Sequence, residues 1–266
     1  MADRDRDAPT VAAATGDASL DHRLYLKALV EYDGTDFFGF QWQSDCRTVQ
    51  GELEKALEAV TQERTRVIGA GRTDAGVHAV GQVVAFCVRW RHSLADLERA
   101  WNALLPEDVA VRQVEPAPEG FHPRFSARSR RYRYTIWNGP RRSPLHRRYA
   151  WVHPVSLDES LMNQATQFLI GEHDFAAFGE PPQGENSVRH VYHAHWSRCG
   201  DLVWFDIEAN AFLKRMVRNL VGALTRVGRR EVSPEWVREV LESRDRARCA
   251  PPAPACGLCL MEVIYT

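Results

Sequence analysis

The order of predicted strands and helices, which occurs twice along the chain, constrains its fold more than any other feature. Alternating apolar residues predict strands, and apolar residues at helical spacing predict helices. In the first half, the order strand, helix, strand, strand, helix, strand falls at residues 24–32, 49–60, 66–69, 82–88, 94–104 and 109–114. In the second half, the same order falls at residues 131–137, 157–170, 188–196, 202–208, 213–224 and 258–265. One additional helix is predicted to open at Ser233-Pro234.

This order is that of the split βαβ, or ferredoxin-like, unit. Two such units in tandem predict an α+β fold, in which both halves contribute to one mostly antiparallel sheet with the helices on one side. A large ligand would then bind on the open side or in a cleft between the halves. We expect half-domains at residues 22–120 and 121–266, preceded by a disordered tail at residues 1–21. RNA-binding modules use the same strand order, although a fold alone does not define a function.

The distribution of charge is more informative than its total. The formal net charge of −1 by itself argues against a nucleic-acid-binding protein. Residues 121–157, however, contain no Asp or Glu and nine arginines, which together form a local site for anions. The alternative is a solvated basic surface. Within this segment we expect an RNA-binding patch made of Arg141, Arg142, Arg147 and Arg148.

The chain has no feature of a secreted or membrane protein. Its six cysteines are too few for a disulfide scaffold in 266 residues. The N-terminus lacks the basic region and apolar core of a signal peptide. No segment approaches the roughly 18 consecutive apolar residues of a membrane span. We therefore expect a cytoplasmic protein with reduced thiols.

A glycine-rich loop between the strands at residues 66–69 and 82–88 is the main candidate for chemistry, because it holds Arg72, Asp74 and His78. A carboxylate beside a guanidinium stays ionised at neutral pH, and an ionised carboxylate can act as a covalent nucleophile. The Arg-x-Asp pattern alone favours a structural salt bridge that stabilises the turn. A dinucleotide-binding loop does not fit, because Asp74 stands where that motif needs glycine and no helix follows.

The segment Gly71-Arg-Thr-Asp-Ala-Gly-Val-His78 resembles the catalytic signature of the bacterial tRNA pseudouridine synthase A family. Other segments resemble the same family in order, from about residue 24 to residue 265. They are Glu-Tyr-Asp-Gly-Thr at 31–35, Gly-Phe-Gln at 39–41, Thr-Val-Gln at 48–50, Phe-His-Pro-Arg-Phe-Ser-Ala at 121–127, Arg-Tyr-Arg-Tyr at 131–134, His-Asp-Phe-Ala-Ala-Phe at 173–178, Ala-Asn-Ala-Phe at 209–212, Met-Val-Arg-Asn at 216–219 and Gly-Leu at 257–258. Two positions depart from the family pattern: Phe40 replaces a tryptophan and Cys259 replaces an aromatic residue.

The resemblance implies roles for individual residues. The catalytic aspartate of the family corresponds to Asp74, and its uracil-stacking tyrosine corresponds to Tyr132. Arg72, Arg124 and Arg218 correspond to arginines expected near the active cleft, with Arg218 closest to the carboxylate. For Tyr132 the alternative is a core residue, because strand alternation puts it on the same face as Tyr134.

The resemblance also implies the reaction and its partners. The expected activity is isomerisation of uridine to pseudouridine at positions 38 to 40 of the tRNA anticodon arm. It requires no metal or cofactor, and the expected enzyme is a homodimer in which one tRNA contacts both subunits. Whether Asp74 attacks C6 of the ring, attacks C1′ of the ribose or assists elimination is left open.

Three other functions compete with this interpretation. The first is a non-catalytic RNA-binding module, which would share the fold and the arginines but would not need Asp74. The second is a structural or scaffolding α+β protein. The third is a zinc protein, with candidate ligands His190, His193, His195 and Cys199, or Cys249, Cys256 and Cys259.

Overall fold

The computed structural model describes residues 23–181 and 184–266, so the tail predicted at residues 1–21 lies outside the described residues. The first half contains β1 (Arg23–Tyr32), α1 (Val49–Thr61), β2 (Ile68–Gly69), β3 (His78–Arg89), α2 (Leu94–Leu104) and β4 (Val109–Pro116). The second half contains β5 (Ser129–Trp137), β6 (Trp151–Val152), α3 (Glu159–Thr166), β7 (Gly171–Asp174), β8 (Val188–Cys199), β9 (Leu202–Ala209), α4 (Met216–Gly228), α5 (Glu235–Ser243) and β10 (Leu258–Ile264).

Every predicted strand and helix is present, although several bounds differ by a few residues, and three further differences have a physical reason. The short strands β6 and β7 were not predicted, because two and four residues carry too little alternation to be recognised. The helix predicted from residue 213 begins at Met216 instead. Arg215, which precedes it, has a left-handed backbone with φ +62°, and a right-handed helix cannot include that conformation. None of the helices in the described ranges is long and apolar enough to cross a membrane.

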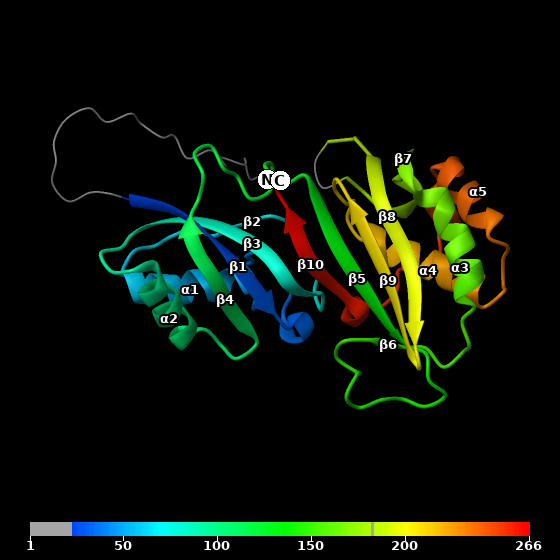
Figure 1. Cartoon of the computed structure of the whole chain (residues 1–266), viewed down its shortest axis with the longest axis horizontal. Helices are drawn as coiled ribbons and strands as arrows, with labels where there is room; N and C mark the ends of the chain where they lie inside the picture. Colours follow the sequence, from blue (N-terminus) through cyan, green and yellow to red (C-terminus); the bar gives the residue numbers. More distant parts are fainter. Residues whose placement is uncertain (1–22, 182–183) are drawn as a thin grey trace.

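The described strands form one ten-stranded sheet in the order β4-β1-β3-β10-β5-β9-β8-β7, with β2 beside β3 and β6 beside β5. Its strand pairs are antiparallel except β3 with β10 and β5 with β6. Figure 1 shows the two halves side by side, with β10 at their junction. The predicted α+β class with a mostly antiparallel sheet is therefore confirmed.

One face of the sheet is buried and the other is partly exposed. In β1, every second residue from Leu26 to Tyr32 is buried, as expected when side chains alternate between the faces. The buried face packs against helices. Trp101 of α2, for example, meets Phe86 of β3 edge to face at 4.9 Å between ring centroids. Figure 1 shows α1 and α2 behind the first half and α4 behind β8 and β9.

The junction between the halves is narrow. β3 and β10 pair through only two residue pairs, at the beginning of each strand. Gly81 allows this close approach, because a Cβ atom there would lie 2.1 Å from the carbonyl oxygen of Met261. Further along, β3 pairs with β2. The loop that connects β2 to β3 is therefore located where the two halves meet.

Candidate active site

The loop between β2 and β3 is held by hydrogen bonds at its first residues. The Ala70 N–H donates to the carbonyl of Val83 at 2.8 Å. The side-chain amide of buried Gln82 donates to the carbonyl of Gly71, also at 2.8 Å. Because both partners belong to β3, the sheet itself positions the start of the loop.

The next residues of the loop contact the segment that follows β1. The carbonyl of Thr73 accepts a hydrogen bond from the Phe40 N–H at 3.1 Å, and its buried hydroxyl lies 2.8 Å from the hydroxyl of Tyr32. Gly39 has φ +91°, and a Cβ atom there would lie 2.7 Å from the Thr73 carbonyl oxygen, so only glycine fits. These contacts fix the backbone immediately before Asp74.

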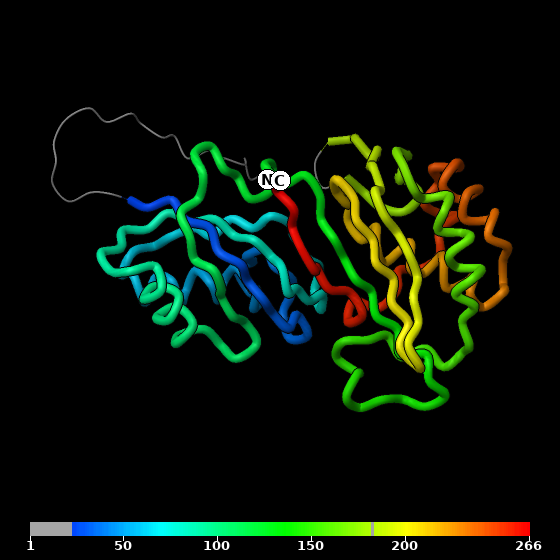
Figure 2. The backbone as a smooth tube through the Cα atoms, in the orientation of Figure 1, coloured from blue at the N-terminus to red at the C-terminus, as the bar shows by residue number. Residues whose placement is uncertain are grey.

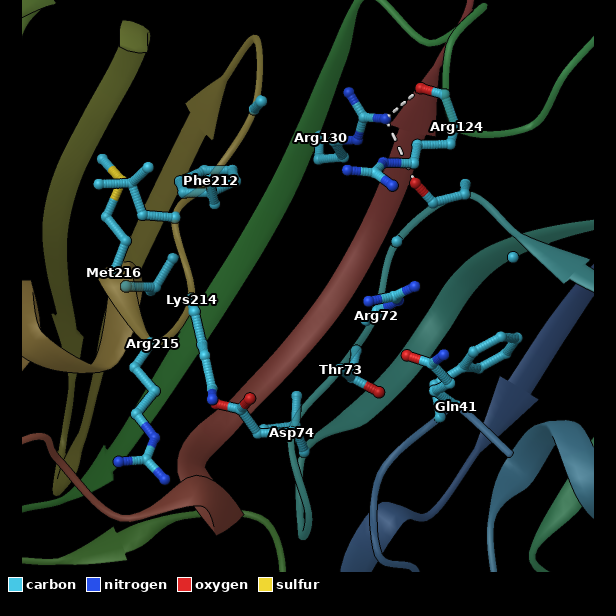
Figure 3. A pocket seen from close by; sticks show the side chains of 18 of the residues that line it. Gln41, Arg72, Thr73, Asp74, Arg124, Arg130, Phe212, Lys214, Arg215 and Met216 are labelled. Atoms are coloured by element: carbon cyan, nitrogen blue, oxygen red, sulfur yellow. Dashed lines mark hydrogen bonds between the residues drawn. The ribbon is translucent and has the colours of Figure 1, made fainter. Parts of the chain in front are cut away.

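Asp74 lines a cavity of about 860 Å³ to which both halves contribute. Figure 3 shows Arg72, Thr73 and Asp74 on one side of this space and the segment from Phe212 to Met216 on the other. A large ligand was expected either on the open side of the sheet or in a cleft between the halves, and the cavity has the second of these positions. Among the described residues, two acidic side chains line it, those of Asp74 and Glu180. They are outnumbered by seven basic residues, namely Arg66, Arg72, Arg124, Arg130, Arg189, Lys214 and Arg215.

Arg218 pairs with Asp74. The Arg218 Nη1 atom lies 3.4 Å from Asp74 Oδ2, and the two side chains are 15% and 30% exposed. The Nε atom of Arg218 donates to the carbonyl of Ala253 at 2.7 Å, which orients the guanidinium. In this partly buried setting, the guanidinium offsets the negative charge of the carboxylate more strongly than it would in water. The predicted proximity of Arg218 to Asp74 is therefore present.

Tyr132 reaches the same cavity from β5. Its side chain is 8% exposed, and its ring meets Phe212 edge to face at 5.1 Å. Burial raises the pKa of Tyr132 to about 12, so its hydroxyl is protonated at neutral pH. Within the described ranges, no hydrogen bond to a protein group is made by this hydroxyl. Tyr134 lies on the same face and is fully buried. Tyr132 is therefore part of the core, as the alternative interpretation predicts, and it also lines the cavity.

Arg72 and Arg124 also line the cavity. Figure 3 shows the side chains of Arg72 and Asp74 pointing in different directions. Among the described residues, the ion pair of Asp74 is formed with Arg218 and not with Arg72. The pairing suggested by the Arg-x-Asp pattern does not form, because the loop is not a regular strand here and residues two apart need not share a face.

The comparison with protein families decides between the interpretations left open by the sequence. The sequence profile described as tRNA pseudouridine synthase matches residues 28–126 and 165–266, which include Asp74 and Arg218. The chain belongs to the tRNA pseudouridine synthase family. The motif resemblance found in the sequence is thereby confirmed.

Relatives of this synthase match along nearly the whole chain. The chain is 45% identical over 242 residues to tRNA pseudouridine synthase A of Thermotoga neapolitana. The aligned residues make up 90% of this chain and 99% of that protein. It is 48% identical to the protein of the same name from Roseiflexus castenholzii, covering 89% of this chain and 88% of that protein. The Chloroflexus aurantiacus protein of that name is likewise 48% identical, and the alignment covers 90% of this chain and 88% of the Chloroflexus protein.

Arg130 of the synthase, which the sequence did not single out as a site residue, connects three segments around the cavity. Its Nη1 atom donates to the carbonyl of Asn210 at 2.8 Å. Its Nη2 atom donates to the carbonyls of Arg124 and Ala70 at 2.6 and 3.2 Å (Figure 3). Burial lowers the pKa of Arg130. One signal could have found it: alternation puts Arg130 on the same face of β5 as Tyr132, where an arginine is unusual.

Replacing Arg130 by methionine should weaken both stability and catalysis. Charged hydrogen bonds contribute about 1.5–3 kcal/mol each, so loss of three should lower the free energy of unfolding by roughly 4 kcal/mol or more. Because Ala70 precedes Asp74 on the same loop, loss of the contact should also misplace the carboxylate and lower kcat by roughly 10- to 100-fold. Chemical denaturation and single-turnover pseudouridine formation measure the two effects.

The matched control is Arg128→Met, since the side chain of Arg128 is exposed and makes no hydrogen bond or ion pair with the described residues. Wild-type stability and rate in the Arg130 variant would contradict a positioning role for Arg130.

The predicted patch lies on the loop between β5 and β6, and none of its four arginines lines the cavity. Figure 2 shows this loop extending from the end of the sheet. Arg141, Arg142 and Arg147 are exposed. The guanidinium of Arg148 instead lies 3.2 Å from a carboxylate oxygen of Asp36. The segment is thus free of acids only along the sequence, because folding brings the acidic residues after β1 against it.

The histidines and cysteines considered as zinc ligands do not converge. Within residues 23–181 and 184–266, no three His, Cys, Asp or Glu side chains lie close enough to hold a metal ion. His193 and His195 share a face, with ring centroids 6.4 Å apart. The loop histidine His78 is buried, accepts a hydrogen bond from Gly34 N–H at 3.0 Å and lies 3.2 Å from the carbonyl of Cys256. His78 therefore supports the start of β10 and does not line the cavity.

Proposed function

We propose that this chain isomerises uridine to pseudouridine at positions 38 to 40 of the tRNA anticodon arm, with Asp74 as the nucleophile. As a member of its family, the chain is an isomerase that acts on tRNA. One observation carries the proposal: the Asp74 carboxylate is held beside Arg218 at a cavity where basic residues outnumber acidic ones. Such a cavity attracts a polyanion, and the carboxylate within it can act on a bound nucleotide.

The reaction breaks the N1–C1′ bond of uridine and joins C5 to C1′. The proton on C5 is lost and N1 gains one, so no atom or electron is transferred overall and the proposal includes no cofactor. Asp74 can attack C6 of the ring, attack C1′ of the ribose or assist elimination. All three routes need an ionised carboxylate fixed within reach of the bond between base and sugar. The hydrogen bonds that hold the loop between β2 and β3 support such a fixed position.

The neighbouring residues have distinct tasks in this proposal. A uridine in a stem or tight loop must leave its stack before it can react. Tyr132 offers a ring face to the uracil, and its protonated hydroxyl is available as a hydrogen-bond donor. The basic residues of the cavity, Arg72 and Arg124 among them, bind phosphates and hold the backbone without reading the sequence.

We also infer that the two halves are ferredoxin-like units. The strand orders β4-β1-β3-β2 and β10-β5-β9-β8 place corresponding strands alike in the two halves, which supports this. We further propose a cytoplasmic homodimer in which one tRNA contacts both subunits. Light scattering should return the mass of two chains, and the mass of a single chain at working concentration would contradict the dimer.

The direct test of the function is mass-spectrometric mapping of an unmodified tRNA transcript after incubation with the purified protein. New pseudouridine at positions 38, 39 or 40 is the expected result. Binding without any pseudouridine would support a non-catalytic RNA-binding module, and pseudouridine confined to other positions would reject the anticodon arm as the site.

Reversing the charge of Arg141, Arg142 and Arg147 to glutamate should weaken tRNA binding. Each lost phosphate contact is expected to reduce the slope of log affinity against log salt by roughly 0.7–0.9. We leave Arg148 unchanged because it pairs with Asp36. Affinity should be measured across a salt series.

The control must carry the same change of charge in exposed basic residues outside both the cavity and this loop. A suitable triple variant reverses Lys55, Arg91 and Arg238, which form no ion pair with the described residues. An unchanged salt slope in the loop variant would mean that the RNA binds elsewhere.

A further inference from the structure

Two large aromatic side chains are unusually exposed at the cavity that contains Asp74. The side chain of Phe125 is 70% exposed and that of Phe38 is 59% exposed. Both line this cavity, and they come from different halves of the chain. A single exposed apolar residue needs no explanation, but apolar rings gathered at a charged cavity mark a ligand contact.

The ring of Phe125 is held in a fixed position. The His122 ring lies 4.4 Å from it at an angle of 34°, and the Arg124 guanidinium lies 5.4 Å from its centroid. The turn beneath is closed by two hydrogen bonds of 2.9 Å between His122 and Ser126. The carbonyl of Arg124 is further fixed by Arg130. A ring held in this way loses little conformational entropy when a ligand stacks on it.

The chemistry around Phe125 indicates what the ligand is. The cavity volume of about 860 Å³ lies near the top of the roughly 300–1,000 Å³ range of ligand pockets, so it exceeds the needs of one nucleobase. Its basic residues match phosphates. Aromatic rings interleaved with arginines are the usual surface for unpaired bases, because every base has a face that can stack.

We propose that Phe125 is the stacking platform for a nucleobase directly adjacent, on its 5′ or 3′ side, to the uridine that is isomerised. The proposal rests on the proposed function at Asp74 and adds a second base-binding position to it. Phe125 thereby holds the neighbouring nucleotide outside the RNA stack while the uridine occupies the cavity. It is a binding residue for the substrate and takes no part in bond formation.

The first test is kinetic. Phe125→Ala should raise KM for unmodified tRNA by roughly 5- to 150-fold, the range that corresponds to loss of one stacked base, with kcat changed much less. Phe125→Trp should keep the wild-type KM. The matched control is Leu104→Ala, which truncates a 53% exposed apolar side chain outside the cavity. An unchanged KM in Phe125→Ala, with an unchanged melting temperature, would overturn the proposal.

The second test identifies the stacked base. Full-length tRNA is prepared with an abasic nucleotide on the 5′ side or the 3′ side of the target uridine. On one of these substrates, Phe125→Ala should cost nothing further, because the base that it contacts is already missing. Equal losses on the intact tRNA and on both abasic tRNAs would overturn the proposal. If the wild type forms no pseudouridine in intact tRNA, the function proposed for Asp74 has failed instead.

Discussion

Replacing Asp74 by asparagine is expected to abolish pseudouridine formation while leaving the fold and tRNA affinity intact. The amide has the size of the carboxylate, and the backbone contacts of the loop involve neighbouring residues such as Thr73. The asparagine amide lacks the negative charge and nucleophilicity that all three possible routes need. Loss of a nucleophile typically lowers kcat by roughly 10⁴-fold or more. Single-turnover assays on unmodified tRNA, with binding measured in parallel, test this expectation.

Glu180→Gln is the matched control for this substitution. Glu180 is the other acidic residue that lines the cavity, and the same change of charge and atom type applies to it. Its side chain is 65% exposed, so solvent screens its charge. We expect this variant to keep most of its activity. Appreciable turnover by Asp74→Asn would end the proposal that Asp74 is the nucleophile.

Tyr132→Phe is expected to retain stacking on the uracil and to lose most of the rate. Phenylalanine keeps the ring that meets Phe212 but removes the hydroxyl, which has no protein partner in the described part of the chain. A positioned proton donor or acceptor contributes about 10²–10⁴-fold to a rate. We therefore expect kcat to fall by roughly 10²-fold or more, with a small change in KM. Wild-type activity would reduce Tyr132 to a packing residue.

The raised pKa of Tyr132 predicts that the wild type and Tyr132→Phe differ in how their stability depends on pH. Burial favours the neutral phenol in the folded state, and the pKa moves from 10.0 to about 12. The resulting contribution to stability is fully present below the unfolded pKa and is lost as the pH rises through the folded pKa. Between pH 10 and 12, Tyr132→Phe should therefore lose less stability than the wild type. Denaturation at several pH values measures this, and parallel losses would contradict the assignment.

The secondary structure could be predicted largely from the sequence because it depends on neighbouring residues. The alternation in β1 and the helical spacing in α1 arise from side chains a few positions apart. Two strands, β6 and β7, were not predicted because they are too short to carry a period. The start of α4 was placed too early because it depends on the left-handed backbone of Arg215, which no apolar pattern reveals.

The candidate site was only partly accessible from the sequence. Asp74, Tyr132 and Arg218 could be identified because they lie within motifs that resemble those of a family. Arg130 escaped because the acid-free stretch made all of its arginines look alike. Two of its three carbonyl acceptors, those of Ala70 and Asn210, belong to distant segments that meet it only in the folded chain.

The sequence by itself determined the order of the elements, the glycine-rich loop with Asp74 and the family to which the chain belongs. Only the tertiary structure decided which charged residues form ion pairs with one another. Asp74 pairs with Arg218, 144 positions away, and not with Arg72. Arg148 lies in an acid-free segment yet pairs with Asp36. The reason is physical: periodicity arises from residues close together in the sequence, whereas these ion pairs depend on how the fold brings distant loops and helices together.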